Sequence, residues 1–164
     1  MAFDTFLDIA EVPGESTAKG QEGKIEIYSF SWGASNPITI GSGTTGVSAG
    51  KASLSSFNVM KKTDKSSAKL FAACTTGDHF PTMKVVLRKA TGAGGQDAFL
   101  TYTFTEVFVE SIQWSGSSGG DDTPTESVSF AFGKVEIEYK AQGKDGKLKV
   151  DGQASWDVTT VSNT

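Results

Sequence analysis

The side chains that most often carry catalysis or hold metals are scarce in this chain of 164 residues. Cys74 is the single cysteine and His79 the single histidine. One cysteine cannot form a disulfide within the chain, and one cysteine with one histidine cannot build a four-ligand zinc site of Cys and His. Without a second histidine or an activated partner, no acid–base pair can be assembled around His79. We therefore expect no catalytic residue, no bound metal and no cofactor.

Two Gly-rich segments match enzyme motifs by their letters only. Residues 41–46 fit G-x-G-x-x-G, but a dinucleotide site needs a helix directly afterwards, and residues 51–60 have the pattern of a strand. Residues 116–120 fit G-x-S-x-G, but a nucleophile elbow needs a following helix and a histidine later in the chain. The acidic pair at 121–122 with Glu126 lacks the spacing of an EF-hand loop, so we expect it to be solvated.

The charge balance excludes several classes of partner. The chain has 15 Lys and Arg residues against 19 Asp and Glu, a formal net charge of −4, which does not favour nucleic-acid binding. No segment approaches the roughly 20 apolar residues that span a bilayer. The first twelve residues contain three acidic side chains and no basic one, unlike a secretory signal. We expect a cytoplasmic nascent protein with no nucleic-acid partner and no membrane insertion.

The elements that must position any site are mainly strands. Alternating apolar and polar residues, separated by Gly- and Pro-containing turns, are typical of an antiparallel sandwich or barrel. The length favours one domain over residues 1–164. The predicted strands lie at about 3–12, 24–33, 51–60, 82–90, 98–114, 126–140 and 147–160.

One segment has the composition of a helix instead. Asp64 is a suitable N-cap, good helix formers follow it, and Gly77 is a natural stop, so we predict one helix over about 64–76. The apolar face that we expect to pack on the sheet consists of Ala68, Phe71, Cys74 and Thr75.

Several predicted strands have apolar residues on both faces. In 98–114, alternation places Val107 and Val109 opposite a larger set of apolar residues. In 126–140 the apolar phase switches at Gly133, which suggests a bulge that rotates the strand. Since a barrel has only one interior, the outer face should be covered by the helix or by another subunit. The larger set in 98–114 is Leu100, Tyr102, Phe104, Phe108, Ile112 and Trp114.

An ordered set of short stretches carries a family resemblance. They are residues 2–9 leading into 14–16, then 29–33, 64–66 with 70–74, 77–81, 88–90 and 127–132. Together they resemble the Hcp family (haemolysin-coregulated protein), the tube subunit of the bacterial type VI secretion system. The resemblance covers nearly the whole chain, and 29–33 and the segment from the helix to Pro81 are its strongest parts.

The resemblance implies a structural rather than an enzymatic function. Hcp proteins resemble phage tail-tube proteins: a compact antiparallel β-barrel with one flanking helix and a long extended loop, here about 41–50. It implies a homohexamer whose rings stack axially into a tube, with sheath, spike and effector proteins as partners and with no cofactor. It also implies export from the cytoplasm to the extracellular space or a target cell without a signal peptide.

The resemblance also points to two sets of residues. Ser29, Ser31, Ser53 and Ser55 are small polar residues at alternating strand positions that could line the lumen, and the position matched by Ser31 is associated with effector contact in the family. The candidate ring-stacking loop contains Gly41, Ser42, Gly43, Thr44, Thr45, Gly46 and Val47. An exposed, disordered loop in isolated rings is the alternative for this segment.

Two other functions fit the same pattern of strands. A tail-tube protein of a phage or phage-like contractile particle would share the fold and the ring. A stand-alone β-barrel binding module, such as a sugar binder, would be monomeric or dimeric and would lack apolar residues on both faces. The mass in solution separates this last alternative from the ring-forming ones.

Overall fold

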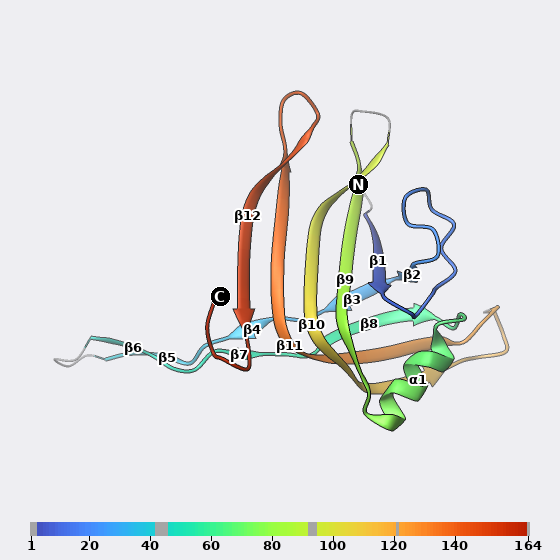
Figure 1. Ribbon diagram of the computed structural model, residues 1–164, viewed down its shortest axis with the longest axis horizontal. Helices are drawn as coiled ribbons and strands as arrows, with labels where there is room; N and C mark the ends of the chain where they lie inside the picture. The colour runs from blue at the N-terminus through green and yellow to red at the C-terminus, as the bar shows by residue number, and fades with distance from the viewer. Residues whose placement is uncertain (1–2, 42–45, 92–94, 121, 164) are drawn as a thin grey trace.

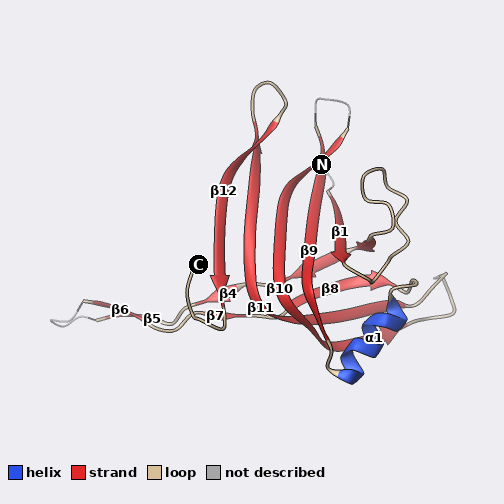
Figure 2. Cartoon of the chain, viewed as in Figure 1, coloured by secondary structure: helices blue, strands red, loops and turns tan. Residues whose placement is uncertain are grey.

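Strands dominate the computed structural model and form an antiparallel barrel with one short helix (Figures 1 and 2). The structure describes residues 3–41, 46–91, 95–120 and 122–163. The main sheet has the strand order β2-β1-β9-β10-β11-β8-β3, and β12 pairs with the second half of β11. The elements are β1 (Asp4–Ile9), β2 (Ile25–Ile27), β3 (Ser29–Ser31), β4 (Ala34–Ser35), β5 (Ile38–Ile40), β6 (Val47–Ala49), β7 (Ser53–Leu54), β8 (Phe57–Lys62), α1 (Ser67–Thr76), β9 (His79–Ala90), β10 (Gln96–Ser115), β11 (Thr125–Gln142) and β12 (Leu148–Asp157).

The barrel closes where the chain passes from β2 to β3. A bend at Tyr28 separates the two strands, so that β2 pairs with β1 and β3 pairs with β8 at the other end of the order. The Tyr28 amide donates a hydrogen bond of 2.8 Å to the Met60 carbonyl of β8. The prediction of one continuous strand over 24–33 is therefore wrong. The bend lets Phe30 and Trp32 pack against the same core as Ile25 and Ile27 instead of facing away from them.

Aromatic and aliphatic side chains fill the interior. Phe57, Phe104 and Phe130 are fully buried, and Trp32 packs edge-on against Tyr102 with ring centroids 5.2 Å apart. Burying each large apolar side chain stabilises the fold by about 1.5–3 kcal/mol, so this cluster is the main source of the barrel's stability. Within the described chain, no helix is long and apolar enough to cross a membrane.

A bend line crosses the three longest strands of the barrel. The register places Glu106 of β10 between Pro81 of β9 and Gly133 of β11. In a regular strand every second side chain points inwards, but here the next inward side chain comes three positions later. This step runs from Phe104 to Val107 in β10 and from Phe132 to Val135 in β11. The predicted phase switch at Gly133 is confirmed, but the predicted bulge there is wrong, since the register of β10 with β11 shifts only between Val109 and Ser111. Because β10 changes phase with β11, their register continues through it without a shift.

The phase change also corrects the predicted faces of β10. Val107 and Val109 lie in the core with Phe104, whereas Phe108 is exposed. Glu106 adopts a φ of +57°, which is unusual for a residue with a side chain. Because the backbone is left-handed at Glu106, the side chains that follow it point to the opposite face from the one that strict alternation would give.

The helix is shorter than predicted and presents a different face to the barrel. It begins at Ser67 instead of Asp64, because the Asp64 carboxylate accepts hydrogen bonds from the Ser66 amide and from Lys61 and so forms a turn before the helix. The predicted stop is confirmed: Gly77 has a φ of +75° and its amide donates to the Ala73 carbonyl. Ser67, Leu70 and Ala73 are the buried residues. The predicted packing face is wrong for Ala68, Phe71 and Thr75, which are exposed, whereas Cys74 is half-buried and packs against the core as predicted.

Part of the predicted long loop at 41–50 is a strand, β6, which forms a hairpin with β5. β6 pairs with β5, with Ile38 opposite Ala49 and Ile40 opposite Val47. Nearer the barrel, β4 pairs with β7. These two pairs make an arm, residues 34–41 and 46–54, that extends from the barrel along the longest axis of the molecule (Figure 1). Residues 42–45 of the predicted stacking loop lie outside the described residues.

Candidate functional site

One outward face of the barrel has two rows of uncharged, mostly polar side chains. Each row crosses β3, β8, β11 and β10 in register. All eight residues are exposed or half-buried. The first row is Ser29, Met60, Ser127 and Gln113, and the second is Ser31, Asn58, Ser129 and Ser111.

The alternation of these four strands explains why the face is polar. The residues between the two rows point inwards and form the apolar row Phe30, Val59, Val128 and Ile112. Successive side chains of a strand point to opposite faces, so an apolar inner row leaves hydroxyl and amide groups outside. The Ser129 hydroxyl donates to Asn58 Oδ1 at 2.5 Å, which ties β11 to β8 on this outer side.

The structure brings together two of the four predicted lumen residues. Ser29 and Ser31 belong to the two rows and are exposed. Ser53 and Ser55 lie at the base of the arm, where Ser53 pairs with Ser35 and the Ser55 hydroxyl accepts a 2.8 Å hydrogen bond from the Gly33 amide. The lumen function of all four residues stays a prediction.

Sequence reasoning missed the other members of the rows. Asn58, Ser111, Gln113, Ser127 and Ser129 come from strands that are far from Ser31 in the chain. The sequence does indicate that Asn58, Ser127 and Ser129 face outwards, because they alternate with the apolar residues Phe57, Val59, Val128 and Phe130. Only the register showed that these strands are neighbours.

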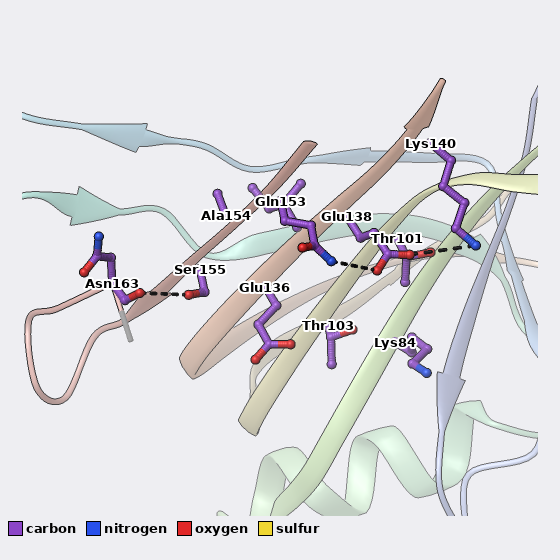
Figure 3. A pocket seen from close by; sticks show the side chains of 11 residues that line it. Lys84, Thr101, Thr103, Glu136, Glu138, Lys140, Gln153, Ala154, Ser155 and Asn163 are labelled. Carbon is purple, nitrogen blue, oxygen red and sulfur yellow. Dashed lines mark hydrogen bonds and ion pairs between the residues drawn. The ribbon is translucent and has the colours of Figure 1, made fainter. Parts of the chain in front are cut away.

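A hollow of about 780 Å³ lies over a different part of the outer surface, on β9 to β12 (Figure 3). Lys84 and Lys140 line it together with Glu136 and Glu138. Glu138 accepts a hydrogen bond of 3.2 Å from Gln153 and lies 3.8 Å from the Lys140 ammonium. The two lysines and two glutamates of the hollow largely neutralise one another. No His or Cys lines the hollow, so we find no nucleophile–base pair in it.

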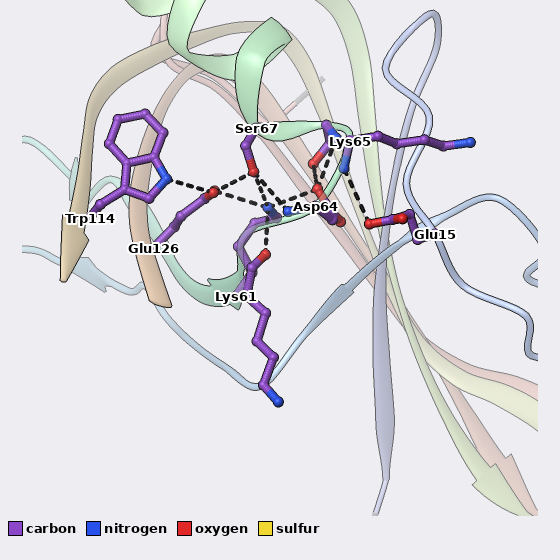
Figure 4. A network of polar contacts seen from close by, with 9 residues as sticks. Glu15, Lys61, Asp64, Lys65, Ser67, Trp114 and Glu126 are labelled. Carbon is purple, nitrogen blue, oxygen red and sulfur yellow. Dashed lines mark hydrogen bonds and ion pairs between the residues drawn. The ribbon is translucent and has the colours of Figure 1, made fainter. Parts of the chain in front are cut away.

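A buried ionic network lies beside α1 and contains two of the three buried charged residues in the described part of the chain (Figure 4). Lys61 of β8 and Glu126 of β11 are both fully buried, with Nζ and Oε1 2.9 Å apart. Glu126 also accepts hydrogen bonds from the Ser67 hydroxyl and, at 2.8 Å, from Trp114 Nε1. Every strong donor and acceptor here has a protein partner, which indicates a structural connection between β8, β11 and α1 rather than an open reactive site.

The single cysteine and the single histidine, which are the most reactive side chains of the chain, lie apart from these surfaces. The Cys74 thiol is half-buried and lies 3.7 Å from the Glu110 carbonyl. His79 is exposed at the start of β9, with its ring 5.5 Å from that of Phe108. Among the described residues, no group of three or more His, Cys, Asp or Glu side chains could hold a metal ion.

Comparison with known proteins identifies the family. The family model described as "Type VI secretion system effector, Hcp" matches residues 6–139. The chain belongs to the Hcp family. The match includes all eight residues of the polar rows and helix α1. The predicted family and the predicted barrel with one flanking helix are both confirmed.

Individual relatives agree with this assignment. Protein hcp1 of Pseudomonas aeruginosa is 38% identical over 146 residues, which cover 89% of this chain and 88% of the relative. A solved type six secretion system protein superimposes with a TM-score of 0.91 at 39% identity and covers 99% of this chain and 100% of its own. Hcp1 of Salmonella typhimurium superimposes with a TM-score of 0.78 at 29% identity over the full length of both chains.

Proposed function

We propose that six copies of this Hcp protein form a ring, that rings stack into the inner tube of the secretion system, and that the subunit acts without catalysis. The observation that carries the proposal is the pair of uncharged rows on an outward face of an Hcp barrel. A surface of Ser, Asn and Gln side chains offers hydrogen bonds without fixed charge, so a passing protein can be held weakly and released. This face would line the lumen.

The proposal extends to export and to effector carriage. The subunit would leave the cytoplasm with the tube, together with sheath and spike proteins as partners, and effectors would contact Ser29 and Ser31 in the lumen. Apolar side chains on the outer surface support assembly, because large ones such as Phe71, Phe108 and Trp114 are substantially exposed in the single chain.

The mass of the purified protein in solution tests the assembly. We expect native mass spectrometry and light scattering to give a mass near six protomers. A monomer whose mass does not change with concentration would contradict the proposal and favour a stand-alone binding module. Cargo is tested separately, by asking whether an effector protein co-purifies with the ring.

A further inference from the structure

The face that carries the polar rows also carries one carboxylate. Glu110 is the extra residue of the bulge in β10 between Val109 and Ser111, and it is exposed. Its carboxylate accepts a hydrogen bond from the hydroxyl of Ser56, which directly precedes β8. Because β11 lies between β10 and β8, the Glu110 side chain reaches across β11. The inner side of β11 is packed core at this level, with Phe130 fully buried, so the carboxylate lies on the outer side beside the second polar row.

This carboxylate has no counter-charge within the described part of the chain. The ion pairs there all involve other carboxylates, namely those of Asp8, Asp64, Glu126, Glu136 and Glu138. The eight residues of the polar rows are themselves uncharged. Glu110 therefore gives the face of the rows a negative charge that is free to attract a cation.

Asn58 fixes the direction of the hydrogen bonds around Glu110. Its Nδ2 lies 3.2 Å from the Ser56 carbonyl and 3.5 Å from the Ser31 carbonyl. Carbonyl oxygens only accept, so the NH₂ group must face them, and Oδ1 faces Ser129. The Ser129 hydroxyl consequently donates its proton to Asn58 Oδ1 at 2.5 Å. The Ser56 hydroxyl likewise donates its proton to the Glu110 carboxylate.

These bonds leave only acceptors on the surface around Glu110. A serine hydroxyl has one proton to donate and two lone pairs to accept with. The protons of Ser56 and Ser129 are already used, so both oxygens offer lone pairs alone to a partner. Together with the carboxylate they make a small surface that accepts hydrogen bonds and does not donate them. We call Ser56, Glu110 and Ser129 the acceptor patch.

The acceptor patch selects a partner by its chemistry. Ammonium and guanidinium groups have donors, no acceptor and a positive charge, so they match both the lone pairs and the carboxylate. A carboxylate of the partner would place like charges and lone pairs against one another. Exposed ion pairs are individually weak, so a cation held here is also released readily.

We propose that the acceptor patch binds the lysine and arginine side chains of proteins that pass along this face. The inference rests on the proposed function, because it takes this face as the wall of the lumen, and it adds the chemical class of the cargo contact. In a ring of six copies the patch occurs six times. A cargo with several basic side chains would therefore engage several patches at once, and the weak contacts would add up.

A charged peptide tests the patch. The probe is fluorescently labelled penta-lysine, and the same peptide with acetylated lysines is the neutral comparison. Fluorescence anisotropy at physiological ionic strength should show that the protein binds penta-lysine and binds the acetylated peptide much less. Glu110→Gln keeps the shape of the side chain and removes the charge, so it should weaken binding of penta-lysine by about fivefold or more. Glu110→Lys should reverse the preference towards penta-glutamate.

Glu136→Gln is the matched control. It removes the same charge from an exposed residue in the hollow on β9 to β12, away from the polar rows. We expect it to change the binding of penta-lysine by less than about twofold, because distant charges are screened at this ionic strength. Circular dichroism checks that each variant is folded.

The outcomes separate this inference from the proposed function. Unchanged binding in Glu110→Gln, or an equal loss in Glu136→Gln, would overturn the acceptor patch while the ring remains. A changed mass of Glu110→Gln in light scattering would place Glu110 in a subunit contact and would also overturn it. If the unsubstituted protein is monomeric at all concentrations, the proposed assembly fails, and the same titration still decides whether the patch binds cations.

Discussion

Lys61 Nζ lies 2.9 Å from Glu126 Oε1, and both side chains are fully inaccessible to solvent beside the start of α1 (Figure 4). The two residues are 65 positions apart in the chain. Taking two charges out of water is costly, so a pair of this kind persists only where further hydrogen bonds satisfy it. Here Ser67, Trp114 and Asp64 supply those bonds. The network therefore fixes the position of α1 on the barrel.

Removal of one charge from this network should strongly destabilise the fold. We expect Lys61→Met to lower the free energy of unfolding by about 3–5 kcal/mol, because Glu126 would remain buried without a counter-charge. Urea unfolding followed by circular dichroism measures the change. Adding Glu126→Gln to Lys61→Met should recover a large part of the loss, since the fully buried carboxylate is removed and only the partly exposed Asp64 loses its counter-charge.

An exposed ion pair provides the control for this prediction. Lys134 and Glu136 are 3.2 Å apart, with side chains 30% and 54% exposed. Lys134→Met should cost less than about 1 kcal/mol. Equal losses for Lys61→Met and Lys134→Met would show that burial does not determine the strength of the first pair.

The left-handed backbone at Glu106 should respond to the choice of side chain. Glu106→Val should destabilise the protein by about 1–2 kcal/mol, because a β-branched residue is poorly accommodated at positive φ. Glu106→Asn should be neutral or stabilising, since asparagine tolerates this conformation. Thermal unfolding distinguishes them, with Glu136→Val on β11 as the control. If Glu106→Val were harmless, the bend line would not depend on this residue.

A charge placed in the polar rows should alter cargo and leave assembly unchanged. Ser31 is exposed, so we expect Ser31→Lys to fold, to form rings of unchanged mass and to retain much less effector. Light scattering and co-purification measure the two effects. Ser118→Lys makes the same substitution at an exposed position between β10 and β11, outside the rows. Loss of the ring in Ser31→Lys alone would instead place Ser31 in a subunit interface.

Tyr102 should make the stability fall at high pH. Burial raises the pKa of Tyr102, although a hydrogen bond from Trp32 partly opposes the shift. The unfolded chain therefore loses this proton at a lower pH than the folded protein, so the contribution to stability is present below about pH 10 and is lost as the pH rises further. Urea unfolding between pH 8 and 11 should show a steeper loss for the native protein than for Tyr102→Phe. Identical curves would contradict this assignment.

Ring stacking should strengthen with salt. Each chain carries a formal net charge of −4, so six copies in a ring repel a second ring, and added salt screens that repulsion. Sedimentation at low and high ionic strength measures the fraction of stacked rings. More stacking at low ionic strength would show that attractive ion pairs between rings outweigh the net charge.

Part of the fold could be predicted from local patterns. The alternation of apolar residues predicted the strands, Gly77 predicted the end of the helix, and Gly133 predicted the change of phase in β11. These features depend on residues close together in the chain, whose spacing determines which side chains share a face. The resemblance to the Hcp family likewise followed from short stretches in a fixed order, and the family match over residues 6–139 confirms it.

Other features depended on residues that are distant in sequence. Nothing near Ser67 indicates that its hydroxyl donates to a carboxylate 59 residues away. With Ser67 on the buried side of the helix, Leu70 lies inwards and Phe71 outside. Nothing near Tyr28 indicates that its amide bonds to β8 and divides the predicted strand. The polar rows exist only because the register of four strands places Ser31, Asn58, Ser129 and Ser111 side by side.

The amino-acid sequence by itself therefore determined the kind of protein: a β-rich Hcp chain with one helix and few reactive side chains. Only the tertiary structure decided which face of that helix is buried, where the strand at Tyr28 divides, and which polar residues form one surface. The physical reason is that burial and strand pairing are long-range choices. A side chain goes inside when its distant partners compensate for the loss of water, and local periodicity does not contain that information.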